Sequence, residues 1–361
     1  MTPRRHARRP PVPFEVLLIG LVVVVAAAMW AGTRARGSDA RAEAGGPSPS
    51  PSRPSRVASP SASASSSSSA SASPSATPKR PLVIHAAGDV SLDPSYIPAF
   101  RSNGYAWAWT GLDGLFEHDD LTIVNHECPS TTLVAPVPKE FNFRCDPAAL
   151  PVAKRYGVDV MSLANNHGYD QGPQGLLDSI RNIQHAGIVP IGAGKDAESA
   201  DAPRYVDVKG WRIGLVGVDE VLDPLDEAAT ADKPGTAVGH DFARALASIR
   251  EAAAHADLVI VMLHWGVELD TQPRDDQIRE THQMIAAGAD IIFGSHSHRL
   301  EPMDTIDGHP VFYGLGNFVW PNFSVDGSTT AVAEVRVSPD GSITGRLLPA
   351  YIEAPGHPVL R

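Results

Sequence analysis

Residues 289–298 read Ala-Asp-Ile-Ile-Phe-Gly-Ser-His-Ser-His and contain the strand end that points most directly to the fold. The apolar Ile-Ile-Phe triplet predicts a buried strand, and Gly294 permits a sharp turn where that strand ends. His296 and His298 lie just past this end, one residue apart, so both side chains can point into one crevice. Open α/β sheets bind ligands beyond the carboxyl ends of their strands, so the pair predicts a site, although paired histidines also occur in ordinary loops.

Four other apolar runs are also followed by side chains of the types that commonly bind metal ions. The runs and their residues are 82–84 with Asp89, 121–124 with Glu127, 158–161 with Asn166 and His167, and 258–261 with His264. Each side chain alone has an ordinary interpretation, as a turn or cap residue, a solvated acid or a core histidine. One site explains all five runs together, because carboxylate, carboxamide and imidazole form a set suited to a divalent cation.

Helical patterns separate the strand runs and predict a layered α/β domain with parallel strand pairing. Apolar residues recur at helical spacing over residues 172–187 and 241–255, and more weakly over 274–287. After Pro310 the pattern changes to successive strands, which are expected at 311–313, 330–337 and 343–351, with a hairpin turn at 339–341 between the last two. We therefore expect an α/β domain that closes with an antiparallel section.

The beginning of the chain predicts a membrane anchor. A basic cytoplasmic tail, residues 1–15, precedes uncharged and mostly aliphatic residues at 16–33, just long enough to span a bilayer as a helix. Arginines before the span favour a cytoplasmic N-terminus, which predicts a single-pass cell-membrane protein with its folded domain extracytoplasmic. A cleaved signal peptide is the alternative, but there is no small-x-small cleavage site followed by a mature start, and Arg34 and Arg36 flank the span closely. A transmembrane signal-anchor is therefore favoured.

Residues 34–80 are largely Ser, Ala and Pro and predict a disordered linker to a folded domain at 81–361. Residues 1–80 carry 11 of the 30 Lys and Arg and 3 of the 41 Asp and Glu, which leaves 19 basic and 38 acidic residues, a net charge near −19, in the domain. So acidic a surface argues against nucleic acid as a partner. It argues equally against adhesion to anionic polymers unless a metal ion or a local basic cleft intervenes.

The chain has two cysteines, Cys128 and Cys145, both on the expected outer side of the membrane. An oxidising compartment favours a disulfide that closes a short loop. Two buried thiols are the ordinary alternative. A third is that Cys128, beside Glu127, binds a metal ion.

The strand-end residues suit a two-metal hydrolase. Two divalent ions about 3.5–4 Å apart can clamp a phosphoryl group and activate a water molecule between them. Such a site needs a bridging carboxylate and gains from a general acid, and Asn166-His167 fits a metal ligand followed by that acid. Asp170, three residues further on, either orients His167 or caps a helix before Pro173.

Short motifs in this order resemble the CapA family of capsule and poly-γ-glutamate synthesis proteins. They are Gly88-Asp89-Val90-Ser91-Leu92, Asn125-His126-Glu127-Cys128-Pro129, Leu163-Ala164-Asn165-Asn166-His167, His264-Trp265-Gly266-Val267-Glu268, Gly294-Ser295-His296-Ser297-His298 and Gly314-Leu315-Gly316-Asn317-Phe318. The resemblance covers roughly residues 82–320, and the family is similar to the calcineurin-like metallophosphoesterases. It implies an α/β fold, a metallophosphoesterase-like sandwich of two β-sheets flanked by helices, which would follow the N-terminal transmembrane helix.

The resemblance also implies roles for the strand-end residues. The implied ligands of one ion are Asp89, Glu127 and His298, and those of the other are Glu127, Asn166, His264 and His296. Glu127 would bridge the two ions, and His167 would be the general acid. The expected cofactors are one or two divalent ions of Mn, Fe or Zn, all of which accept these ligand types.

Three positions depart from the metallophosphoesterase pattern. Ser91 stands two residues after the first aspartate, where a histidine is usual, so one ion would be held weakly or not at all. His126 stands where the family more often has an aliphatic residue and could partly substitute for that histidine. Glu127 is longer than the aspartate of the wider superfamily. These departures bear on two-metal catalysis and leave the fold prediction intact.

We therefore expect a membrane-anchored, metal-dependent hydrolase in capsule or poly-γ-glutamate-type envelope polymer biosynthesis. The expected partners are an anionic envelope polymer or its precursor, a membrane polymer synthetase complex, and the membrane through the N-terminal helix. Ser91 favours the alternative, a non-catalytic polymer-binding or assembly factor that keeps the fold. A polysaccharide-binding module is a third hypothesis, if Trp107 and Trp109 place two indoles on one face of a strand.

Overall fold

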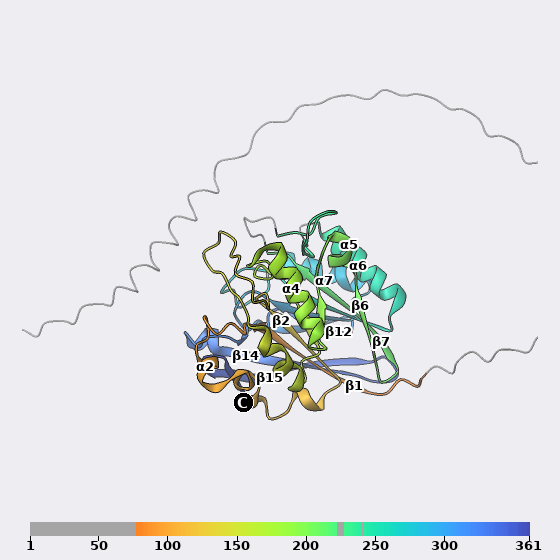
Figure 1. Ribbon diagram of the computed structural model, residues 1–361. Coiled ribbons are helices and arrows are strands. Elements are labelled where there is room, and N and C mark those ends of the chain that lie inside the picture. Colours follow the sequence, from red (N-terminus) through yellow and green to blue (C-terminus); the bar gives the residue numbers. More distant parts are fainter. Residues whose placement is uncertain (1–76, 222–226, 240) are drawn as a thin grey trace, which may run out of the picture. The chain divides into compact units, whose positions relative to one another are not determined.

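The computed structural model describes residues 77–221, 227–239 and 241–361 (Figure 1). The expected membrane span at 16–33 and most of the expected linker at 34–80 lie outside the described residues. Within the described part of the chain, no helix is long and apolar enough to cross a membrane. Residues 77–80, at the end of the expected linker, contact the folded domain: Arg80 N–H donates to the Lys209 carbonyl at 3.0 Å.

The first sheet contains the strands that follow the N-terminal linker and those at the C-terminus. Its order is β16-β15-β14-β1-β2-β3-β4, and β13 also pairs with β1. The parallel strands are β1 (Leu82–Val90), β2 (Leu121–His126), β3 (Val160–Ser162), β4 (Val189–Ile191) and β13 (Asn317–Val319). The antiparallel strands are β14 (Thr329–Val337), β15 (Ile343–Ala354) and β16 (His357–Leu360). This confirms the predicted antiparallel section at the end of the chain.

The second sheet contains strands from the middle of the chain in the order β11-β12-β10-β9-β7-β6. The parallel strands are β7 (Trp211–Asp219), β9 (Leu258–His264), β10 (Ile291–Ser295) and β12 (His309–Phe312). The antiparallel edges are β6 (Arg204–Val208) and β11 (Met303–Ile306). A small ribbon of β5 (Ala193–Gly194) and β8 (Gly235–Thr236) stands apart.

The two sheets pack face to face through a shared apolar layer. Ile84 and Ile123 from the first sheet meet Ile260 and Phe293 from the second in one buried cluster. Successive strand residues point to opposite faces, so the intervening residues lie on the outer faces, where helices cover them. Such a two-sheet arrangement buries both faces of each sheet, which explains why the strand runs are continuously apolar.

Helices cover the outer face of each sheet (Figure 1). On the first sheet α3 (Leu150–Arg155) and α4 (Gly172–His185) join one apolar cluster, and on the second α6 (Phe242–His255) and α7 (Asp275–Ala287) join another. The short helices are α2 (Ala99–Asn103), α5 (Ala197–Asp201), α8 (Val325–Ser328) and the 3-10 helices η1 (Tyr105–Ala108), η2 (Thr110–Leu112), η3 (Phe116–His118) and η4 (Pro147–Ala149). The three predicted helices are confirmed within two residues at each end.

Strand β7 has no counterpart among the predicted elements. Gly214 and Gly217 interrupt its apolar pattern, and glycine lowers the tendency to form a strand. The structure gives both residues a packing reason: a Cβ on Gly214 would lie 3.1 Å from Ala252 of α6, and one on Gly217 would lie 2.9 Å from the Gly192 backbone. The glycines therefore allow a close approach that only the tertiary structure reveals.

The hypothesis of an indole platform is wrong. Trp107 lies in the 3-10 helix η1 and not in a strand, and its ring stacks on His357 with centroids 3.7 Å apart. Trp109 is 1% exposed and belongs to the core. The two indoles are thus packing residues, which leaves no paired surface for a sugar.

Gly294, near the end of β10, lies where the backbone packs too closely to admit a side chain. A Cβ there would overlap the Tyr313 carbonyl oxygen and lie 2.6 Å from Trp265 Nε1. We expect Gly294→Ala to lower the free energy of unfolding by about 3 kcal/mol or more, because backbone must move. Gly341→Ala, at φ +90° in open space, should cost only about 1 kcal/mol. Urea unfolding followed by circular dichroism measures both, and equal losses would contradict close packing at Gly294.

Candidate metal centre

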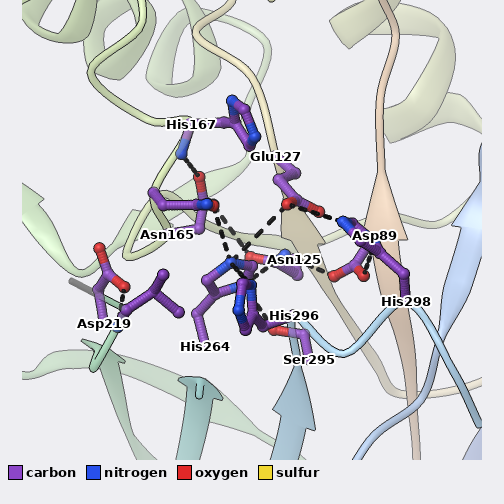
Figure 2. Close-up of polar contacts among 12 residues, drawn as sticks. Asp89, Asn125, Glu127, Asn165, His167, Asp219, His264, Ser295, His296 and His298 are labelled. Atoms are coloured by element: carbon purple, nitrogen blue, oxygen red, sulfur yellow. Dashed lines mark hydrogen bonds and ion pairs between the residues drawn. The ribbon is translucent and has the colours of Figure 1, made fainter. Parts of the chain in front are cut away.

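The carboxyl ends of parallel strands from both sheets meet at one place (Figure 2). In the first sheet Asp89 of β1 pairs in register with Asn125 of β2, and Glu127 follows two residues later. In the second sheet His264 of β9 pairs with Ser295 of β10, directly before the two histidines. Parallel pairing thus aligns the strand ends within each sheet, and packing of the sheets brings the two edges together.

Glu127 lies at the centre of this group. Its side chain is fully buried, and neither carboxylate oxygen has a hydrogen-bond partner. The nearest basic atoms are His264 Nε2, 3.7 Å from Oε1, and His298 Nε2, 3.9 Å from Oε1. Burial, and secondarily the charge of Asp89, raises the pKa of Glu127 well above its usual range. An unpartnered buried carboxylate is costly, and a bound cation removes that cost.

His264 collects the second group of ligand atoms. Its Nε2 lies 3.0 Å from Asn166 Oδ1 and 3.1 Å from His296 Nδ1. Burial lowers the pKa of His264 well below its usual range, and burial together with the charge of His298 lowers the pKa of His296 to about 4. Both imidazoles are therefore neutral at pH 7 and can offer a lone pair to a metal ion.

The other ring nitrogen of His264, Nδ1, contacts two polar side chains on the side away from the ligand atoms. Its Nδ1 lies 3.2 Å from Asn125 Nδ2 and 3.1 Å from Ser295 Oγ. Asn125 Nδ2 donates to Asp89 Oδ1 at 2.8 Å. Such contacts fix the orientation of metal-binding side chains, as second hydrogen bonds do in known metal sites. Asn125 was not among the predicted site residues, although it precedes Glu127 by two and therefore shares its face of β2.

Asp89 and His298 form the remaining part of the group. His298 Nδ1 and Asp89 Oδ2 lie 2.9 Å apart, and the Asp89 side chain is fully buried. Burial opposes charge on both groups, but their mutual attraction outweighs it, which lowers the pKa of Asp89 and raises that of His298. Ser91 is fully buried nearby in the chain, and its hydroxyl oxygen has no hydrogen-bond partner. This side therefore offers fewer ligand atoms than the His264 side.

The backbone at the two histidines adopts an unusual conformation. His296 has φ +96° and His298 has φ +53°. Left-handed φ values cost non-glycine residues about 1–3 kcal/mol each, and such strain concentrates at functional sites. Here it turns the loop after β10 so that both imidazoles face the group around Glu127 (Figure 2). The structure thus brings both predicted histidines to the site.

His167 and Asp170 lie beside the ligand atoms as a pair. His167 Nδ1 lies 2.8 Å from Asp170 Oδ2, and Asp170 is fully buried. The N-cap of α4 is Gln171, and its side chain makes no capping bond, so Asp170 does not cap this helix. The structure therefore favours the orienting role for Asp170 over the capping alternative.

His126 points away from the site. Its Nε2 lies 2.8 Å from Ser130 Oγ, and its ring lies close to Cys128 and Cys145. The two cysteines form a disulfide, which confirms the predicted pairing and removes them as metal ligands. His126 alternates with Asn125 and Glu127 along the chain, so it occupies the opposite face and cannot substitute for a histidine at Ser91.

The residues present fit a divalent cation. Among the described residues, Asp89, Glu127 and His264 bring three buried ligand atoms within 4.8 Å of one another. Asn166, His296 and His298 add an amide oxygen and two imidazoles at the distances given above. Carboxylate, amide and imidazole ligands suit Mn, Fe or Zn, and both Glu127 oxygens lack any other partner.

Sequence comparison places these residues in a known family. Residues 83–322 match the family model described as bacterial capsule synthesis protein PGA_cap. The chain belongs to this family. It is 32% identical over 238 residues to the PGA biosynthesis protein CapA of Bacillus subtilis (strain 168), covering 65% of this chain and 62% of that protein. It is 29% identical over 259 residues to the capsule biosynthesis protein CapA of Bacillus anthracis, covering 67% and 62%.

The family resemblance read from the motifs is thereby confirmed. The chain spans 62% of the length of each Bacillus relative. Among solved structures, it is similar to a novel phosphatase from Mycoplasma pneumoniae, with a TM-score of 0.48 and 13% identity over 75% of this chain and 94% of that one.

Glu127→Gln should separate metal binding from folding. Without metal, we expect the variant to be at least as stable as the wild type, because it loses an unpartnered buried carboxylate. With Mn²⁺ at 100 times its Kd, the wild type should gain about 2.7 kcal/mol and the variant less than 1 kcal/mol. Thermal unfolding with and without Mn²⁺ measures both effects.

Glu301→Gln is the matched control. Glu301 is 3% exposed, and burial raises its pKa to about 7, but it lies outside the group of ligand atoms. This variant should keep the full stabilisation by Mn²⁺. A Glu127→Gln protein that also kept it would show that Glu127 is not a ligand.

Proposed function

We propose that this chain is a metal-dependent hydrolase that acts on an anionic envelope polymer or its precursor. The observation that carries the proposal is the buried Glu127 carboxylate, without hydrogen-bond partners and surrounded by carboxylate and imidazole ligands. A structural core has no use for such a group, whereas a metal centre requires it. Membership of the family of capsule synthesis proteins supports a role in the synthesis of an envelope polymer.

The ligand atoms divide into two sets that share Glu127. Asp89 and His298 would hold one ion, and Asn166, His264 and His296 would hold the other. Bound divalent ions would polarise a phosphoryl or carbonyl oxygen and make water more acidic. The protein contributes the fixed positions of the ligands, since burial and hydrogen bonds limit their movement.

His167 is the proposed general acid. The Asp170 carboxylate can only accept a hydrogen bond, so it fixes the proton on His167 Nδ1 and leaves Nε2 to hold and release the second proton. Burial lowers the pKa of His167, and the hydrogen bond to Asp170 partly offsets this effect. Protonated His167 can give its Nε2 proton to a leaving group, and because its pKa is lowered, the protonated fraction falls as the pH rises toward neutrality.

The proposed location is the outer side of the cell membrane, with residues 16–33 as the anchor. The Cys128–Cys145 disulfide supports this location, because disulfides persist in oxidising compartments. The acidic domain would repel an anionic polymer over most of its surface, so the metal centre would be the point of attraction. A membrane polymer synthetase is the proposed partner that supplies the polymer.

A second candidate function is a non-catalytic assembly factor that binds polymer through one metal ion. Ser91 favours this candidate, because a buried hydroxyl stands where an imidazole would complete the Asp89 and His298 side. Such a protein would bind one ion per chain and release no product. The two candidates therefore differ in metal stoichiometry and in turnover.

His167→Asn tests the hydrolase. We expect kcat to fall by about 10²–10⁴-fold with bound Mn²⁺ unchanged, because the variant loses the proton donor and keeps the ligands. The full chain is assayed with bis-p-nitrophenyl phosphate and with poly-γ-glutamate, and Mn²⁺ is measured by elemental analysis. His185→Asn, on the exposed end of α4, is the matched control and should keep wild-type turnover.

Two results would contradict the proposal. Turnover by His167→Asn within twofold of the wild type would remove His167 from the mechanism. One bound ion per wild-type chain, with no product from either substrate, would favour the assembly factor.

A further inference from the structure

The disulfide closes a loop, residues 128–145, that begins directly after Glu127 and runs beside the turn carrying His167. Val137 N–H donates to the Asp170 carbonyl at 3.0 Å, and Ala135 N–H donates to Gln171 Oε1 at 2.9 Å. In return, Gln171 Nε2 donates to the Phe143 carbonyl at 3.1 Å. The loop and the turn between β3 and α4 are therefore joined by hydrogen bonds in both directions.

Asp170 receives most of its hydrogen-bond and charge partners from this loop. Its Oδ2 accepts from the Phe143 N–H at 2.7 Å as well as from His167 Nδ1 at 2.8 Å. Its Oδ1 lies 3.0 Å from Lys139 Nζ. Because Asp170 is fully buried, these contacts take the place of water and hold the carboxylate in one orientation.

Lys139 connects the acid to the metal ligands. Its ammonium donates to the Asn166 carbonyl and lies 3.4 Å from Glu227 Oε1, in addition to its ion pair with Asp170. The side chain is 9% exposed, so it is placed by its partners rather than by solvent. Since Asn166 Oδ1 faces His264, one lysine restrains both the ligand segment and the residue that orients His167.

The same loop packs against the imidazole itself. The Phe143 ring lies against His167 with centroids 4.4 Å apart. The two rings are tilted by 44°, so the Phe143 ring occupies the space on one side of the imidazole. The loop thus restrains His167 directly through Phe143 and indirectly through Asp170.

Both ends of the loop are fixed. The disulfide joins Cys128 and Cys145 with their Cα atoms 5.7 Å apart, and Ser130 N–H donates to Ser179 Oγ of α4 at 2.9 Å. Covalent closure removes open conformations that a free segment of this length would sample. The disulfide therefore limits movement of the residues that contact Asp170.

We propose that the disulfide-closed loop 128–145 is the positioning element for the general acid, with Lys139 as its principal positioning residue. The proposal rests on the proposed hydrolase function for its effect on turnover. Lys139 contacts the Asn166 carbonyl and the Asp170 carboxylate, and we place its positioning effect on the acid at these two residues. Its loss should misplace the acid and leave the ligand atoms in place, because its contact with Asn166 is to the backbone carbonyl and not to the ligand atom Oδ1.

Lys139→Met and Lys139→Arg test the positioning role in the full chain. We expect Lys139→Met to lower kcat by about 10–100-fold with KM within about threefold and bound Mn²⁺ unchanged, because misplaced groups affect chiefly the reaction step. Lys139→Arg should recover most of kcat, since it keeps the positive charge. Lys195→Met, at a lysine whose side chain is 76% exposed, is the matched control.

Hydrogen exchange gives a readout that does not need turnover. In the full chain, the amides of residues 165–171 should exchange at least about tenfold faster in Lys139→Met and in Cys128→Ser/Cys145→Ser than in the wild type or Lys195→Met. If the wild type shows no hydrolysis, the proposed function fails, and faster exchange still supports the positioning role. Unchanged exchange in both variants, or loss of Mn²⁺ in Lys139→Met, would overturn the positioning proposal.

Discussion

The site depends on one electrostatic constraint, the burial of the Glu127 carboxylate beside a second carboxylate. Two such groups cannot share a dry site cheaply, and Asp89 is balanced by His298 while Glu127 has no hydrogen-bond partner. His264 and His296 are neutral, and the charge of His298 is paired with Asp89, so these imidazoles do not balance a charge on Glu127. A divalent cation would satisfy the carboxylates, the amide and the imidazoles at once, and on our proposal this is why these groups lie together.

The sandwich is the means by which that group is assembled. Asp89 and Glu127 come from one sheet and His264 and His296 from the other, so neither sheet alone holds the ligand set. The packed apolar layer between the sheets fixes the distance between their edges. The strained loop after β10 then carries two of the proposed ligands, and the disulfide-closed loop contacts the proposed acid.

Much of this arrangement could be predicted from the sequence, because strand ends and their polar residues are local features. The five apolar runs, the three helices and the antiparallel end all follow from the spacing of apolar residues. The place of Asn125 in the site could also have been predicted, because residues two apart in an extended chain share a face and Asn125 precedes Glu127 by two. Strand β7 could not be predicted in this way. Its glycines are required by close packing against α6 and Gly192, which are not its neighbours in the sequence.

The sequence alone determined the strand ends, the ligand types and the family, because periodicity and motif order are carried by neighbouring residues. Only the tertiary structure decided which side of β2 His126 takes relative to the site, and that Asp170 orients His167 instead of capping α4. It also decided that Lys139 contacts Asn166 and Asp170. The physical reason is that these contacts join segments whose separation is set by loop closure and sheet packing, which leave no periodic signal in the chain.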